Sequence, residues 1–212
     1  YLRPEPRMAA TRDAYRGYVA RLFTLAQVAD AEAAAGRVVA FETALAEKHW
    51  DRARSRDRNA TYNKMPVAEL QALTPGWRWT SHLEAAGLGA ATDVVVRQPD
   101  YLRALDTLVA ATPVGTWREY LTFKLLDAYA GALPKAFGDA RFAFRGRVLA
   151  GQQAEPARWK RAVDVVGGTM GEAVGKLYVE RHFRPEAKAR MDAMVRNLVE
   201  AYRIGIDSLD WM

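Results

Sequence analysis

The sequence predicts an all-α fold, an irregular multi-helix bundle with long helices and one short extended segment. Two observations support this fold class. Apolar residues recur at intervals of three and four along most of the 212 residues, the spacing that places them on one face of a helix. A strand-like run occurs only at residues 93–97, Asp-Val-Val-Val-Arg. We expect it to be a lone extended connector, because one strand does not make a sheet.

Composition excludes several classes of protein. Hydrophobic residues make up 50% and charged residues 26% of the chain, as in soluble globular proteins. No apolar run approaches the roughly 20 residues that cross a bilayer, so no membrane span is predicted. The chain has no cysteine, which excludes disulfides and thiolate metal ligands. Its length is sufficient to bury a core, and we expect residues 1–212 to form a single helical domain.

The charge balance is basic but mixed. The net charge of +6 arises from 31 basic and 25 acidic residues that are interspersed along the chain. Without a block of like charge, a solvated mixed surface is the usual interpretation, and nucleic-acid binding is not predicted. The chain starts at Tyr1 without a signal-like segment. We interpret it as a piece of a longer protein, whose localisation the sequence itself does not report.

Helical patterns cover the first half of the chain. We predict helices at residues 8–27, 31–51, 81–86 and 99–111, and a short helix that has Pro66 in its first turn. Asp30 is expected to cap the second of these helices. Pro66 suits a first turn because its missing N–H would have no partner there. Thr112 and Pro113 are expected to end the helix that precedes them.

The second half carries longer helical patterns. We predict helices at residues 114–133, at 158–183 as two pieces hinged at Gly167-Gly168, and from Pro185 onward. The inward stripe of the first is expected to contain Trp117, Tyr120, Leu121, Leu125, Ala128 and Tyr129. Gly171 and Gly175 weaken a helix by about 1 kcal/mol each relative to Ala. We therefore expect them to let another backbone approach closely.

Several spaced motifs occur in a fixed order. They are Tyr62-Asn63-Lys64-Met65 followed by Glu69-Leu70; the Arg/Trp-rich segment around Trp159; Gly175-Lys176-Leu177-Tyr178 followed by Phe183; and Leu209-Asp210-Trp211-Met212. In this order they resemble the helical, non-catalytic N-terminal domain of the neprilysin/endothelin-converting-enzyme family of zinc metallopeptidases. The resemblance covers nearly the whole chain, and the lack of cysteines makes it similar to bacterial members.

This resemblance implies a function for the chain. In the family, a helical cap lobe faces a zinc lobe across a central cavity and limits substrates to short peptides. The partner of this chain would be the zinc lobe of the same polypeptide, with zinc in the parent enzyme, no cofactor in this chain, and a periplasmic or secreted location. The motif residues are interpreted as structural: we expect Asn63 to bond local backbone at a turn and Tyr62 to pack. The substrate-gripping arginines of the family fall upstream of Tyr1, so no substrate-binding residue is assigned by resemblance.

The residues needed for zinc-dependent hydrolysis are not in this sequence. A zinc peptidase of this kind needs His-Glu-x-x-His on a helix, which places two imidazoles on one face. The three histidines, His49, His82 and His182, have no such spacing. We therefore expect neither a metal site nor a catalytic residue in the chain, and no activity of the chain alone.

One surface cluster suggests an alternative function. Arg158, Lys160 and Arg161 flank Trp159, and an arginine can stack on a tryptophan. A stand-alone helical binding module could use this basic face for an anionic partner. The ordinary interpretation is a solvated helix edge beside a buried tryptophan.

Overall fold

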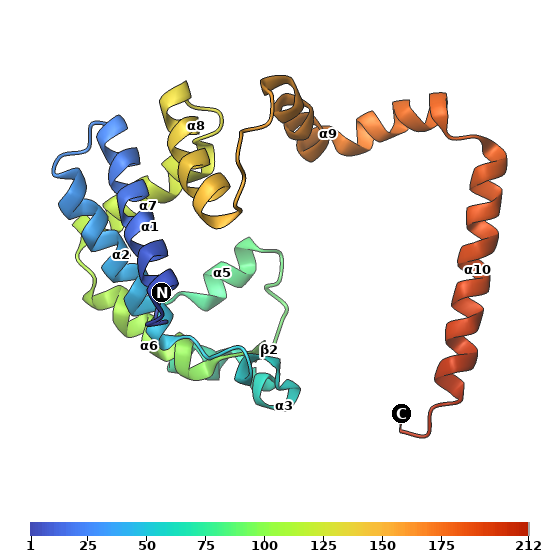
Figure 1. Ribbon diagram of the computed structural model, residues 1–212. Coiled ribbons are helices and arrows are strands. Elements are labelled where there is room, and N and C mark those ends of the chain that lie inside the picture. Colours follow the sequence, from blue (N-terminus) through green and yellow to red (C-terminus); the bar gives the residue numbers. More distant parts are fainter. Residues whose placement is uncertain (212) are drawn as a thin grey trace. The chain divides into compact units, whose positions relative to one another are not determined.

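A computed structural model, in which residues 1–211 are described, is mostly helical (Figure 1). In chain order its elements are α1 (Pro6–Leu25), α2 (Ala31–Lys48), η1 (Arg54–Arg56), α3 (Arg58–Thr61), β1 (Asn63–Pro66), α4 (Val67–Leu73), α5 (Trp79–Ala85), β2 (Asp93–Val96), α6 (Pro99–Ala111), α7 (Val114–Tyr129), α8 (Lys135–Arg141), η2 (Phe142–Leu149), α9 (Arg158–His182) and α10 (Pro185–Asp207). The all-α prediction is confirmed, and η2 is a π-helix. The chain divides into two compact units, Tyr1–Glu155 and Pro156–Met212; the single domain stays a prediction.

The core of the first unit lies where α1 meets α2, α7 and the α8–η2 segment. Its buried residues are Tyr18, Val19, Ala20, Leu22, Phe23, Ala34, Ala35, Val38, Phe123 and Phe144. The small side chains on α2 let it approach α1 closely, and the aromatic rings fill the space toward α7 and η2. The Tyr18 and Phe144 rings stack with centroids 5.2 Å apart, and the Phe123 ring meets Tyr18 edge-on. Such ring pairs add about 0.5–1.5 kcal/mol beyond the apolar area that they bury.

The helix α7 presents only part of the predicted stripe to the core: Tyr120 packs against it, and Trp117 contacts the Phe41 ring. Phe123 is fully buried, whereas Leu121, Leu125 and Tyr129 are exposed. Apolar residues lie on more than one side of α7, so periodicity alone identified the side that packs only in part. The expected cap of α2 is also wrong, because Asp30 adopts a left-handed conformation and its side chain makes no capping hydrogen bond.

A small two-stranded sheet replaces the lone connector. β2 pairs antiparallel with β1, with Asn63 opposite Val96 and Pro66 opposite Asp93. The prediction of a single extended segment is therefore wrong: β1 is too short and too polar to show a strand pattern. Pro66 ends the strand instead of lying inside a helix, and α4 starts at the next residue. Met65, Leu70 and Val96 form a second small core beneath the sheet.

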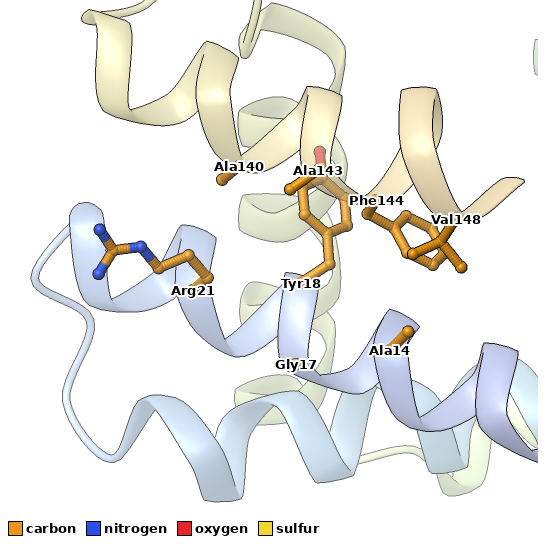
Figure 2. A pocket seen from close by; sticks show the side chains of 8 residues that line it. All are labelled: Ala14, Gly17, Tyr18, Arg21, Ala140, Ala143, Phe144 and Val148. Atoms are coloured by element: carbon orange, nitrogen blue, oxygen red, sulfur yellow. The ribbon is translucent and has the colours of Figure 1, made fainter. Parts of the chain in front are cut away.

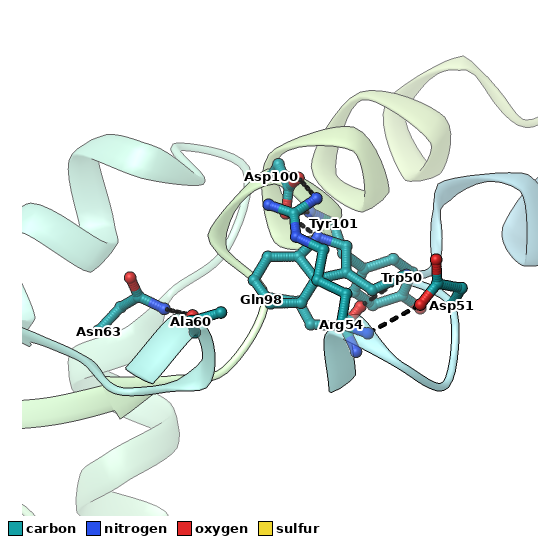
Figure 3. Close-up of polar contacts among 8 residues, drawn as sticks. All are labelled: Trp50, Asp51, Arg54, Ala60, Asn63, Gln98, Asp100 and Tyr101. Atoms are coloured by element: carbon teal, nitrogen blue, oxygen red, sulfur yellow. Dashed lines mark hydrogen bonds and ion pairs between the residues drawn. The ribbon is translucent and has the colours of Figure 1, made fainter. Parts of the chain in front are cut away.

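The segment between α2 and α3 is fastened to the start of α6 (Figure 3). The Arg54 guanidinium lies 3.6 Å above the Trp50 ring. The Trp50 indole N–H donates to Asp100 Oδ1 over 2.6 Å, and the Trp50 backbone N–H donates to Gln98 Oε1 over 3.2 Å. Asp57 caps α3 by accepting from the backbone N–H groups of Asn59 and Ala60. These contacts hold a strongly charged loop next to the sheet.

One buried and one partly buried carboxylate tie α1 to its neighbours. Glu42 on α2 accepts hydrogen bonds from the hydroxyls of Tyr1 and Tyr15, at 2.6 and 2.7 Å. Burial, together with the hydrogen bond to the Glu42 carboxylate, raises the pKa of Tyr15 well above its ordinary value of 10.0. Asp127 on α7 accepts from Tyr18 of α1 and pairs with the guanidinium of Arg145 on η2. Burial alone would raise the pKa of Asp127, but the hydrogen bonds from Arg145 and Tyr18 outweigh it and lower that pKa.

The second unit contains α9 and α10. α9 departs from helical geometry at Met170, with φ −127° and ψ 24°. The break lies two residues beyond the expected hinge at Gly167-Gly168, which itself stays helical. A Cβ added at Gly171 or Gly175 would meet no other atom within 4 Å, so no backbone of the second unit approaches them closely, and the expected approach of another backbone stays a prediction. The last helix begins at Pro185, as predicted.

Replacing Asp127 by Asn should destabilise the chain by about 1.5 kcal/mol, because a charged hydrogen-bond acceptor is lost but Arg145 is partly solvated. The measurement is urea unfolding at pH 7. Asp139→Asn, which removes an exposed pair with Lys135, is the matched control and should cost less than about 0.5 kcal/mol. Equal effects of the two substitutions would contradict a special role for Asp127.

The pair formed by Asp127 and Arg145 makes the stability of the folded chain depend on pH. The pKa of Asp127 is lowered from 3.8 in the folded chain, so its stabilisation is complete above pH 3.8 and is lost as pH falls through the folded value. The difference in unfolding free energy between the wild-type chain and Asp127→Asn should therefore shrink below pH 3.8. A difference that stays constant down to pH 2 would show that the carboxylate charge is not its source.

Candidate functional site

An apolar groove lies between α1 and the α8–η2 segment of the first unit (Figure 2). Its volume is about 230 Å³, and it is lined by Ala14, Gly17, Tyr18, Arg21, Ala140, Ala143, Phe144 and Val148. Small residues on both sides leave the space open, and the Tyr18 side chain extends from α1 toward the segment that carries Ala143. Arg21 is its only charged lining residue. The groove can hold an apolar side chain but offers no acid, base or nucleophile.

A more polar cavity of about 330 Å³ surrounds Glu42. It is lined by Tyr1, Thr11, Arg12, Tyr15, Glu42, Lys124, Phe144, Arg145 and Leu149. Most of its polar groups already have partners within the chain. Glu42 accepts from two tyrosines, Arg145 pairs with Asp127, and Arg12 donates to the backbone carbonyl of Arg3 over 2.6 Å. The arrangement therefore stabilises the helix packing and presents no free catalytic pair.

A third cavity, of about 380 Å³, runs beside the sheet. It is lined by His49, Leu70, Trp79, Leu83, Val94, Val95, Val96, Arg97, Gln98, Tyr101 and Leu102. The Trp79 indole N–H donates to Thr74 Oγ1 over 2.7 Å, which fixes one wall. The His49 and Tyr101 rings stack with centroids 3.9 Å apart and also line the cavity. This cavity combines a rigid apolar interior with the backbone of a strand.

The three histidines lie in separate aromatic contacts. His49 stacks on Tyr101, His82 meets the Trp79 ring edge-on at 6.0 Å, and His182 lies 4.9 Å from the Tyr178 ring. Among residues 1–211, no three His, Asp or Glu side chains are grouped to hold a metal ion. The described residues therefore do not form a zinc site.

The basic candidates lie on the first turn of α9. The Lys160 ammonium is 5.4 Å from the centre of the Trp159 ring, and Trp159 is 66% exposed. Trp159 is thus exposed within the second unit, and its expected burial stays a prediction. Arg158 and Arg161 are three residues apart and share a helix face, whereas Lys160 points elsewhere. A binding role for the three cations stays a prediction, since the structure does not bring them together around one ligand.

The first family motif combines buried and exposed residues. Met65 lies in the small core under the sheet. Asn63 donates from Nδ2 to the backbone carbonyls of Ala60 and Val96, at 2.9 and 3.0 Å (Figure 3 shows the first). It thus bonds backbone, as the sequence predicts, and links the strand pair to α3. Tyr62 is 65% exposed, so its expected packing is wrong in the described chain.

The remaining motif residues lie on the second unit and are open to solvent. Gly175, Leu177 and Tyr178 lie near the end of α9, Phe183 follows that helix, and Trp211 follows α10. None of these side chains is buried among the described residues, and Met212 lies outside them. The structural role assigned to this set stays a prediction.

Sequence reasoning missed the cavity beside the sheet. Its aromatic walls come from Trp79 and Tyr101, and its strand backbone comes from a run that we expected to be unpaired. A partial signal was present: the apolar run at 94–96 is followed, after Arg97, by Gln98 and Pro99, which places a strand edge close to the start of a helix.

The sequence matches a known protein family and several curated relatives. The family model described as peptidase family M13 matches residues 1–212. Neprilysin-2 of Drosophila melanogaster is 29% identical over 188 residues, which cover 81% of this chain and 24% of that protein. Human endothelin-converting enzyme 1 is 26% identical over 205 residues, which cover 93% of this chain and 27% of that protein. The chain thus spans about a quarter of the length of these curated relatives.

Solved structures agree with this assignment. The zinc metalloprotease Zmp1 of Mycobacterium tuberculosis in complex with an inhibitor is 43% identical, with a TM-score of 0.80, and the match covers 99% of this chain and 32% of that one. PepO of Lactobacillus rhamnosis is 22% identical, with a TM-score of 0.71 over 99% of this chain and 34% of that one, and shares the fold. None of the helices in residues 1–211 is long and apolar enough to span a membrane. The chain belongs to peptidase family M13, the family of zinc metallopeptidases, and corresponds to its N-terminal region.

Proposed function

We propose that the chain is the helical cap lobe of a neprilysin-like zinc endopeptidase. In this role it walls a central cavity and restricts substrates to short peptides, while another part of the polypeptide supplies the zinc ligands and the general base. Family membership supports the proposal. So does the chain's share of its relatives, about a third of the solved Zmp1 chain.

One observation carries the proposal: the helices of the second unit have apolar faces that no other part of that unit covers. None of residues 156–211 is buried. On α10 the exposed apolar residues recur every three or four positions, at Met191, Met194, Val195, Leu198, Tyr202 and Ile206. A helix with such a face gains its stability mainly from packing that face against a partner. Exposed apolar surface of this extent marks an interaction site, and we assign it to the zinc lobe of the same polypeptide.

A stand-alone binding module with a basic face finds less support. Its candidate residues on α9 diverge around the helix, and it would leave the apolar faces of α9 and α10 without a function. Salt-sensitive binding of an anionic polymer by the full-length protein would be the sign of that alternative.

The full-length protein should cleave short peptides in a zinc-dependent manner and should reject long or folded ones. The measurement is kcat/KM for peptides of increasing length that share one cleavage sequence, before and after removal of zinc by a chelator. We expect activity to fall steeply beyond a limiting length, because a walled cavity excludes larger chains. The isolated 212-residue chain is the control and should be inactive; cleavage of a folded protein as fast as of a short peptide would contradict the proposed selection.

Leu198→Asp tests the assignment of the α10 face. Leu198 is 52% exposed in this chain, so the substitution should change the stability of the isolated chain by less than about 0.5 kcal/mol. In the full-length protein it should cost about 2 kcal/mol or more, because it buries an unpaired charge in an apolar interface. Glu200→Gln, on the opposite side of the helix, is the matched control. Equal thermal stability of full-length Leu198→Asp and wild type would show that the zinc lobe does not cover this face.

A further inference from the structure

We propose that the free edge of β2 binds an extended peptide segment, with an apolar side chain of that peptide in the cavity beside the strand. The inference rests on the proposed function, since the ligand would be the part of a peptide substrate that lies away from the cleaved bond. It adds a recognition site on the cap lobe that contains no zinc ligand.

The lining of the cavity places it along the strand edge. Val94, Val95 and Val96 all line it, whereas no residue of β1 does. Successive residues of a strand point to opposite faces. A cavity that contacts three successive residues therefore lies beside the strand, on the side away from β1.

The strand has backbone groups available on that side. β2 pairs with β1 and with no other strand in the described chain. An antiparallel partner occupies the N–H and C=O of alternate residues, and the remaining groups point away from it. Among residues 1–211, no segment other than β1 accepts a hydrogen bond from the N–H groups of Val94, Val95 or Val96. Such an open edge is the feature to which extended peptides add as a further strand.

The other edge of the sheet is less suited to this role. β1 ends in Pro66, which has no N–H to donate. The cavity of about 380 Å³ is lined by residues of β2 and by none of β1. The edge of β2 is therefore where a peptide would find both backbone partners and a side-chain pocket.

The cavity wall defines the side chain that it accepts. Leu70, Trp79, Leu83 and Leu102 contribute apolar surface, and a volume of about 380 Å³ falls in the range of small-ligand pockets. The cavity is lined by no carboxylate, and Arg97 lies at the end of the strand. The matching ligand is an extended peptide with a bulky apolar side chain and no basic residue next to it.

The walls are held in place before any ligand binds. Trp79 is fixed by its hydrogen bond to Thr74, and Tyr101 by its stack on His49. Arg97 donates from Nη2 to the Ser55 carbonyl over 3.2 Å. The cavity is therefore already formed when a peptide binds, and little affinity is lost to reordering of the protein.

The experiment compares two peptides on the full-length enzyme. Both share the cleavage sequence; one extends further and carries a phenylalanine, and the other stops short of it. Leu83→Asp should raise KM for the long peptide about tenfold, the loss expected when an apolar side chain is no longer buried. It should leave kcat for both peptides and KM for the short one unchanged. Leu88→Asp, an exposed leucine outside the cavity, is the matched control.

Methylating the backbone nitrogens of the extension tests the strand pairing without any protein variant. The unmethylated long peptide should have a lower KM than the short one. The methylated long peptide should lose this difference, because it can no longer donate hydrogen bonds to the strand edge. If the enzyme cleaves both peptides and neither change affects KM, this inference is wrong and the proposed function stands. If Leu83→Asp abolishes turnover of the short peptide as well, the edge supports the enzyme's own assembly, which also overturns the inference. If the full-length protein cleaves no peptide, the proposed function fails. Fluorescence anisotropy with the labelled long peptide then tests whether the edge of β2 binds it.

Discussion

The packing of the first unit depends on the Asp127 carboxylate, because it joins three helices at one point. It accepts a hydrogen bond from Tyr18 on α1 and pairs with Arg145 on η2, while its own backbone belongs to α7. Burial opposes a charge at this position, and the partners more than offset that cost. The Tyr18 and Phe144 rings stack beside it. The charge pair thereby fixes the orientation of η2, whose π-helical turns would otherwise be less regular than an α-helix.

Much of the fold follows from sequence periodicity, and the exceptions have identifiable causes. α6 has the predicted bounds, Pro99–Ala111, because proline marks its start and Thr112-Pro113 its end. The inward face of α7 was predicted only in part, because apolar residues surround that helix. β1 was missed because Asn-Lys-Met-Pro shows no alternation of its own, and its pairing with β2 depends on a contact between segments about thirty residues apart. Local patterns do not report such contacts.

The sequence predicted less of the candidate site than of the fold. The order of the motifs identified the family. It did not distinguish motif residues that are buried in this chain from motif residues that are exposed in it. Met65 is buried, whereas Tyr62, three residues earlier, is exposed. The cavity beside β2 is built from His49, Trp79 and Tyr101, which are far apart in the chain. No single one of these residues signals a site, because the site arises only when the sheet forms.

The two units differ in how much of their apolar sequence pattern is buried within each unit. In the first unit, apolar patterns on α1 and α2 meet each other and form a core. In the second unit, an equally regular pattern on α10 has no partner within that unit. Exposed apolar stripes are costly in water, so a pattern of this regularity implies a surface that covers it. The proposed cap lobe accounts for both facts, since in that proposal the first unit folds on itself and the second unit contacts the zinc lobe.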